Sequence, residues 1–186
     1  IFASFNWLDI LIIIVLVRIG YTAFKTGLPQ ELFKLLGTVL ATYLSLHYYI
    51  SFSEALSSLK NISQEAIAFI FIIVLISLGY AFFAILRKVF FKIINVEAEN
   101  KVNVWGGLVL GLFRGFLAVS LLTYVFAISP LGYFRQSAKH SYFTKELIKA
   151  APATYTFLWD GIMSKFMAKE KFNEAVLSVQ EGLNKK

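Results

Sequence analysis

The sequence predicts an all-α polytopic membrane protein, a bundle of four transmembrane helices followed by an amphipathic helical tail. Of its 186 residues, 58% are hydrophobic and only 16% are charged, against roughly 45–50% and about 25% in soluble domains. The mean hydropathy is correspondingly high, at +0.70. The apolar residues also form long uncharged runs without the alternation of strands. Because lipid offers the backbone no hydrogen-bond partner, we expect these runs to be helices.

The third and second predicted spans are the clearest. Residues 66–86 carry no charge, and about 20 apolar residues are enough for a helix to cross a bilayer. Residues 31–53 are uncharged beyond their first turn and end in three side chains of a type that settles among lipid headgroups: His47, Tyr48 and Tyr49. We interpret these three residues as an anchor at the membrane interface rather than a chemical site.

The first and fourth predicted spans each contain charge. Residues 7–24 are apolar apart from Asp9 and Arg18, and a Gly-Leu-Pro sequence then breaks the helix. Residues 107–130 lie within a longer apolar stretch whose single charge is Arg114. The fourth helix is therefore expected either to tilt or to begin in the interface.

The four spans define a predicted transmembrane domain, residues 7–134, and residues 135–186 form a tail of different character. Pro152 suits the start of a tail helix. Apolar side chains follow it at helical spacing: Tyr155, Leu158, Trp159, Ile162, Met163 and Phe166. This pattern fits a helix that lies on the membrane and equally one that caps the bundle.

Basic residues in the loops predict the orientation. Four crossings place both termini on one side of the membrane. The first and third loops contain most of the loop charge: Lys25, Lys34, Arg87, Lys88, Lys92 and Lys101. By the positive-inside rule these two loops face the cytoplasm and both termini face outside, although basic residues at the start of the tail favour the opposite orientation.

Small residues recur every fourth position in two of the spans. Such stripes allow helix backbones to approach closely. Within one chain they would close the bundle, and between chains they would build an oligomer. We expect Gly111 to lie at a helix contact. The two stripes are Gly107, Gly111 and Gly115 in the fourth span and Gly37, Ala41 and Ser45 in the second.

Four ionisable residues fall within the predicted spans: Asp9, Arg18, Glu31 and Arg114. A charge at the centre of a membrane helix costs about 2.5–3.5 kcal/mol on insertion scales. Asp9 and Arg18 lie on opposite sides of one helix and cannot pair with each other. We expect a carboxylate from another helix to hold Arg114, with Glu31 the first candidate and Asp9 the second. The alternatives are an interfacial Glu31 and an Arg114 that extends to the headgroups.

The sequence lacks the parts that most chemical sites need. It has no cysteine and only two histidines, His47 and His140, so we expect no metal and no cofactor. It contains none of the common catalytic motifs, so we expect no enzyme. The net charge of +7 is better explained by contact with anionic lipid than by nucleic-acid binding.

Four motifs, taken in order, resemble the colicin V production protein (CvpA) family. They are Trp7-Leu8-Asp9, Gly27 with Glu31, His47-Tyr48-Tyr49, and Gly107-x3-Gly111-x2-Arg114-Gly115. The resemblance covers residues 7–159. It implies a bacterial inner-membrane protein of four helices, linked to production of a secreted toxin and to envelope upkeep, without established enzymatic activity. The chain departs from the family pattern at two places, where Thr26-Gly27 replaces Arg-Gly and Asn103-Val104 replaces Asp-Arg.

Two functional hypotheses follow. In the first, the protein is a multipass accessory or scaffold protein that assembles with itself as a homo-oligomer or with other envelope proteins. In the second, it is a small transporter or channel in which Asp9, Arg18, Glu31 and Arg114 line a polar path. Charges that pair within a closed bundle favour the scaffold, whereas charges along one water-filled route favour the transporter.

Overall fold

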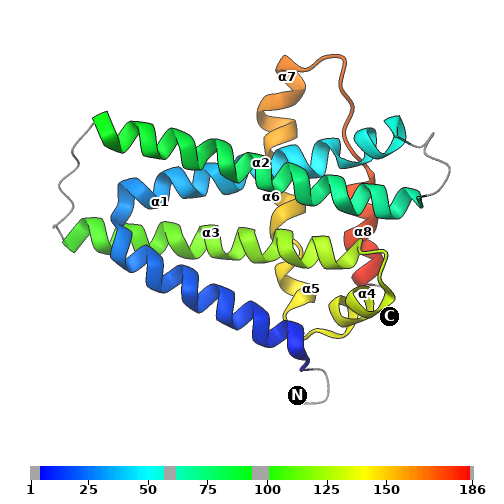
Figure 1. The fold of residues 1–186 in the computed structure, drawn as a ribbon, viewed down its shortest axis with the longest axis horizontal. Helices are drawn as coiled ribbons and strands as arrows, with labels where there is room; N and C mark the ends of the chain where they lie inside the picture. The colour runs from blue at the N-terminus through cyan, green and yellow to red at the C-terminus, as the bar shows by residue number, and fades with distance from the viewer. Residues whose placement is uncertain (1–4, 57–61, 94–100, 185–186) are drawn as a thin grey trace.

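Three long helices dominate the fold. The computed structural model describes residues 5–56, 62–93 and 101–184, and in these residues it contains helices and no strand. The long helices are α1 (Trp7–Ala55), α2 (Gln64–Ile93) and α3 (Lys101–Ala127). Each is long and apolar enough to cross a membrane. They lie side by side along the longest axis of the molecule (Figure 1).

A sharp bend divides α1 into two arms, residues 7–26 and residues 28–55. Gly27 is its one non-helical residue, with φ 73° and ψ 172°, and glycine adopts positive φ without the steric cost that a side chain brings. The two arms are antiparallel: the chain runs toward the bend along the first arm and back along the second (Figure 1). The sequence therefore located the break correctly, and the predicted first and second spans meet at this kink without a loop between them.

The arms of α1 interleave with the other long helices. The second arm lies between α2 and α3, and α3 lies between the two arms (Figure 1). The bend and the start of α3 share one end of the bundle, which we call the bend end. The start of α1 and the end of α3 share the opposite end.

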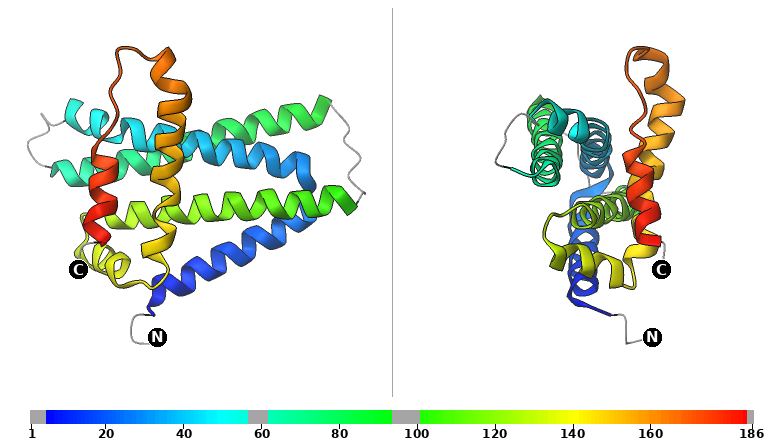
Figure 2. Two further views of the ribbon diagram at one scale, coloured as in Figure 1. Left: turned by 180° about the vertical axis from the view of Figure 1, so that it is seen from behind. Right: turned by 90° about the vertical axis from the view of Figure 1, so that its right-hand side faces the viewer.

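The tail packs across this bundle as a second layer. It contains α4 (Gly132–His140), α5 (Thr144–Leu147), α6 (Ala150–Leu158), a π-helical turn η2 (Trp159–Met163), α7 (Ser164–Phe166) and α8 (Ala175–Asn184). Together α6, η2 and α7 cross one face of the long helices (Figure 2). The predicted apolar face of this segment is divided: Tyr155 and Trp159 are buried against the bundle, whereas Ile162 and Phe166 are exposed.

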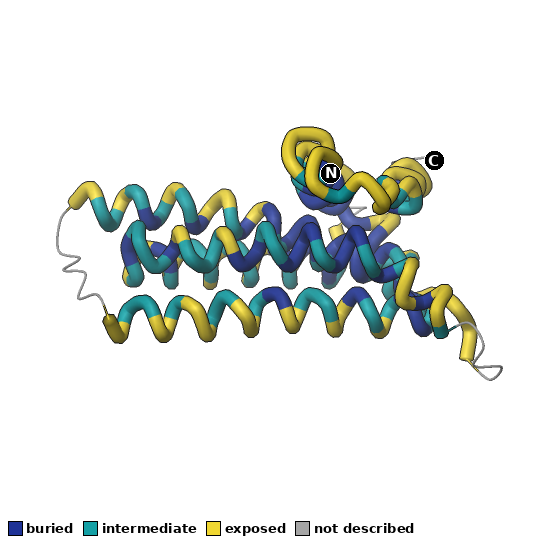
Figure 3. Tube along the Cα trace, turned by 90° about the horizontal axis from the view of Figure 1, so that it is seen from above, coloured by how far each residue is buried: buried dark blue, intermediate teal, exposed yellow. Residues whose placement is uncertain are grey.

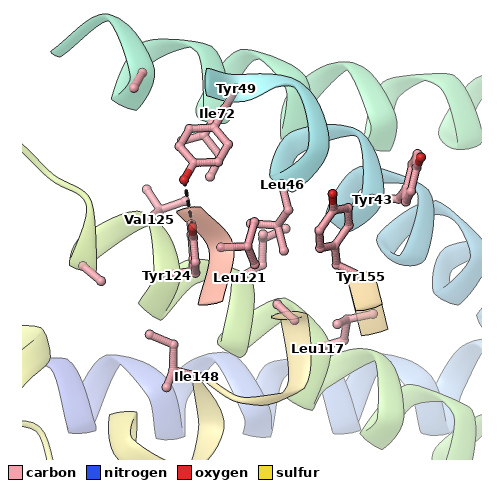
Figure 4. Packing of buried hydrophobic residues seen from close by; sticks show 14 of the residues in the cluster. Tyr43, Leu46, Tyr49, Ile72, Leu117, Leu121, Tyr124, Val125, Ile148 and Tyr155 are labelled. Carbon is pink, nitrogen blue, oxygen red and sulfur yellow. Dashed lines mark hydrogen bonds between the residues drawn. The ribbon is translucent and has the colours of Figure 1, made fainter. Parts of the chain in front are cut away.

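Most of the hydrophobic core lies where the tail meets the long helices. Residues of α1, α3 and α6 come together there, and Tyr49 and Tyr124 join their hydroxyls at 2.9 Å (Figure 4). The outer surfaces of the long helices are exposed along their length (Figure 3). On α2 the exposed residues include Leu78 and Ile85. A continuous apolar surface of this kind is rare on soluble monomers and is ordinary for helices in lipid.

Candidate functional site

A buried ionic cluster lies at the bend end of the bundle. Glu31 lies about one helical turn after the bend, and its side chain is completely buried. Arg114 of α3 donates its Nε hydrogen to Glu31 Oε2 at 3.0 Å. The other oxygen, Oε1, accepts hydrogen bonds from the Lys34 ammonium at 2.5 Å and from the Thr26 hydroxyl at 2.7 Å. Glu31 is thus the partner that the sequence analysis put first for Arg114, and both of its oxygens are occupied.

An asparagine from α3 stabilises the bend beside this cluster. The break at Gly27 interrupts the helical hydrogen-bond ladder, and the N–H of Leu28 instead donates to Asn103 Oδ1 at 2.7 Å. A side chain at position 27 would meet the Asn103 amide at 2.8 Å. Position 27 is therefore restricted to glycine by its backbone conformation and also by the space available.

The glycine stripe of α3 faces the bend and the first arm of α1. A Cβ at Gly107 would lie 2.7 Å from the carbonyl carbon of Gly27, and a Cβ at Gly111 would collide with the Ala23 side chain. A Cβ at Gly115 would lie 3.2 Å from the Cδ2 atom of Leu16. The stripe is therefore a contact between helices of one chain.

The stripe of the second arm of α1 faces α2 in the same manner. A Cβ at Gly37 would lie 2.8 Å from the Cβ of Phe83. A Cβ at Gly79 of α2 would lie 2.7 Å from the Cα of Ala41. Ser45 is buried, and its hydroxyl donates to the Thr42 carbonyl. The sequence left open whether the stripes close the bundle or join separate chains. In this structure both stripes lie at contacts within the bundle.

Asp9 lies at the other end of the bundle, where it holds the tail. It is completely buried. Its carboxylate accepts hydrogen bonds from the Ser141 hydroxyl at 2.6 Å and from the backbone N–H groups of Phe143 at 3.0 Å and Tyr142 at 3.3 Å. It also accepts the N–H of Asn6 in the capping box that begins α1. Asp9, the second candidate partner for Arg114, therefore binds the segment between α4 and α5 instead.

Arg18 belongs to neither group. It lies near the middle of the first arm of α1, is exposed, and forms no ion pair with any residue that the structure describes. Its neighbours on this surface are apolar and also exposed, among them Ile14, Val17 and Tyr21. The four predicted charges are therefore distributed over three separate places.

A histidine-centred cluster was missed by the sequence analysis. His47 and Tyr49 are only 4% and 2% exposed, so their assignment as interfacial anchors is wrong. The tail covers His47, and Tyr49 is hydrogen-bonded to Tyr124 of α3. The Nδ1 atom of His47 lies 2.9 Å from the Tyr155 hydroxyl of α6, and its Nε2 atom lies 3.4 Å from Glu170. The ring stacks on Trp159 at 5.1 Å between centroids.

The hydrogen bonds of this cluster indicate its protonation pattern. The Tyr155 oxygen accepts the backbone N–H of Asn173 at 2.9 Å, which leaves its own hydrogen to donate to Nδ1 of His47. Burial raises the pKa of Tyr155 to about 12, so the hydroxyl keeps that hydrogen near neutral pH. Nε2 of His47 then carries the hydrogen that faces Glu170. Nothing in the sequence joins residues 47, 155 and 170, and only the folded tail reveals the cluster.

Across residues 5–56, 62–93 and 101–184, the structure has no group of three or more histidine, aspartate or glutamate residues placed to hold a metal ion.

Comparison with known families identifies the chain's relatives. The model of a protein family described as colicin V production protein matches residues 8–152. The chain belongs to the colicin V production protein family. The match includes the ionic cluster, Asp9 with its partners Ser141, Tyr142 and Phe143, and the start of α6. Searches of curated proteins and of solved structures gave no match.

Family membership and fold together describe a membrane protein of the colicin V production family with at least three apolar helices of spanning length. Two of the residues that the sequence analysis singled out as departures, Thr26 and Asn103, lie at the bend, where Thr26 donates to Glu31 and Asn103 accepts from Leu28.

Proposed function

We propose that this member of the colicin V production family is a multipass protein of the bacterial inner membrane that acts as an accessory or scaffold protein. Both arms of α1 together with α2 and α3 cross the bilayer, with the bend end toward the cytoplasm and both termini outside. The protein acts in toxin production and envelope upkeep by assembling through its helices with copies of itself or with other envelope proteins.

The exposed position of Arg18 is the observation that carries this proposal. It lies nine residues from the bend, which is about 13 Å along the helix. Facing lipid there, a guanidinium without a partner would cost on the order of 2.5–3.5 kcal/mol. A second protein that packs on the first arm and supplies a carboxylate or carbonyl groups removes this cost. The apolar residues around Arg18 provide the rest of such an interface.

The arrangement of the other charges supports assembly over transport. A transporter or channel lined by the four predicted charges needs them along one path. Instead, Glu31 and Asp9 are enclosed by hydrogen-bond partners at opposite ends of the bundle, and Arg18 lies on the outer surface of the first arm. A bundle closed by two small-residue stripes and fixed charges suits a rigid component of a larger assembly.

Cross-linking in native membranes tests the proposal directly, because the chain has no cysteine of its own. Val17→Cys places a thiol beside Arg18, where the side chain is 66% exposed. Ile85→Cys is the matched control on α2, at 62% exposure. We expect a bifunctional thiol-to-amine reagent to join Val17→Cys to a second copy or to an envelope protein, and Ile85→Cys to give far less product.

The same experiment separates the possible outcomes. Adding Arg18→Gln to Val17→Cys should reduce the specific product, and mass spectrometry of the product distinguishes a homo-oligomer from a complex with another protein. Equal yields from positions 17 and 85 would reflect random collision and would contradict an interface on the first arm. Solute flux through proteoliposomes of the purified chain would instead favour the transporter.

A further inference from the structure

A cavity of about 200 Å³ lies between the second arm of α1, α2 and α3. Three of its lining residues are basic: Lys34, Arg87 and Arg114. The other lining residues include Tyr80, whose hydroxyl donates to Thr38, and two phenylalanines, Phe33 and Phe83, which provide apolar surface. The cavity therefore combines converging positive groups with an apolar surface.

The positive charge around this cavity exceeds the negative charge. Glu31 is the one carboxylate that pairs with these cations among the described residues, so three cations minus one anion leave an excess of two. The excess is held in a restricted space, since the side chains of Lys34 and Arg114 are only 16% and 12% exposed. Water alone compensates closely spaced, largely buried cations poorly.

Donor groups remain available in the cavity. Arg114 uses Nε for Glu31, and its two Nη groups donate to no residue that the structure describes. Arg87 likewise has no hydrogen bond or ion pair within the described part of the chain. Guanidinium groups present a planar fork of N–H donors that matches the oxygens of a phosphate.

We propose that this cavity binds a phosphate group, carried by an anionic phospholipid or by a soluble phosphate compound. Arg87 and the Nη groups of Arg114 bind its oxygens, Lys34 contributes charge, and the phenylalanine surface contacts the apolar part of the ligand. Arg87 lies six residues before the end of α2, which is roughly 9 Å along the axis. That depth is close to the headgroup region, where basic pockets between helices bind anionic lipids. The inference does not depend on assembly through the first arm.

Ligand-induced stabilisation of the full chain in neutral detergent tests this site. The probes are phosphatidylglycerol, phosphatidylcholine and inorganic phosphate, each added separately, with the melting temperature as the readout. We expect a phosphate-bearing anion at about 100 times its Kd to raise the melting temperature by roughly 5 °C or more. Arg87→Gln should lose most of this rise. Its own starting stability should stay near wild type, because Arg87 bonds to no described residue.

Lys88→Gln is the matched control, since it removes the same charge from the next residue, which is exposed and does not line the cavity. It should keep the full rise. A rise with phosphatidylglycerol alone identifies a lipid as the source, and an Arg87-dependent rise with inorganic phosphate identifies a soluble compound. Equal losses in the two variants would show general surface attraction and would overturn the proposal, as would a rise that phosphatidylcholine matches or no rise with any probe.

Discussion

Glu31 and Asp9 are both completely buried carboxylates in α1, yet the protein stabilises them in different ways. Glu31 receives hydrogen bonds from the charged side chains of Arg114 and Lys34 and from a hydroxyl. Asp9 receives its hydrogen bonds from neutral donors, a hydroxyl and three backbone N–H groups. Glu31 therefore belongs to a network of several charges, whereas Asp9 is a single buried charge stabilised mainly by backbone N–H groups.

This difference assigns the two carboxylates different tasks. A network of long charged side chains connects helices that already pack through glycines, and its surplus positive charge remains available to a ligand. Backbone N–H groups that converge on one carboxylate fix a particular chain segment in place. Glu31 thus connects α1 to α3, and Asp9 connects α1 to the start of the tail.

Neutralising Glu31 should produce the largest loss. Glu31→Gln keeps the shape of the side chain but leaves the largely buried Arg114 and Lys34 without a counter-charge. Removing one partner of a buried ion pair typically costs about 3–5 kcal/mol. We expect a loss of this size in thermal unfolding of the chain in detergent. In a double-mutant cycle with Arg114→Gln, the double variant should lose about 1–3 kcal/mol less than the sum of the singles.

The exposed pair between Lys149 and Glu146 is the control for this cycle, with a nitrogen-to-oxygen distance of 2.7 Å. Solvent screens such pairs, so its coupling should stay below about 1 kcal/mol. If the Glu31–Arg114 cycle gave the same small coupling, the bend end would not contain the charge network described above.

The glycine contact beneath the network gives the second prediction. Gly107→Ala places a Cβ 2.7 Å from the carbonyl carbon and 2.8 Å from the Cα of Gly27, and backbone atoms cannot rotate away as a side chain can. We expect a loss of about 3 kcal/mol, at the upper end of the usual cost of overpacking.

Gly20→Ala is the matched control for this contact, because a Cβ at Gly20 meets nothing within 4 Å. There the exchange should be neutral or stabilising by up to about 1 kcal/mol, as alanine is the better helix former. Two variants of equal stability in detergent would mean that α3 does not pack against the bend.

The bend end could largely be predicted from the sequence, because its components are visible there. Gly27 and Pro29 mark the break, Gly107 and Gly111 mark the contact, and a carboxylate in an apolar run calls for a cation. What the sequence could not provide was the surplus of cations, because Arg87 was assigned to a loop and not to the wall of a cavity.

The opposite end could not be predicted in the same way. The partners of Asp9 are mostly backbone N–H groups. Every residue except proline has such a group, so no residue type in the sequence indicates which ones will bind Asp9. His47 was misassigned for a related reason. An aromatic group at the end of a span looks the same in sequence whether lipid or a folded tail covers it, and here Tyr155 of α6 and Trp159 of η2 cover it.

Asp9→Asn should give the smallest of the three losses, but the most localised. One oxygen of Asp9 accepts from Ser141 and Phe143, and the other accepts from Asn6 and Tyr142. If the new NH2 group faces Asn6 and Tyr142, both backbone N–H groups lose their acceptor. If it faces Ser141 and Phe143, the Ser141 hydroxyl can turn to accept, and only the Phe143 N–H loses its acceptor. We expect a loss of about 2 kcal/mol, typical of buried donors left without acceptors.

The loss at Asp9 should also release the tail, and proteolysis can detect this. Limited proteolysis of the Asp9→Asn variant should cut near residues 141–143 faster than in the wild type, whereas the bundle should stay intact. Asp160→Asn makes the same chemical change at the chain's other aspartate, which is exposed, and it should alter neither stability nor cleavage. If cleavage instead increased throughout the long helices, Asp9 would support the whole bundle, and the contrast drawn between the two carboxylates would fail.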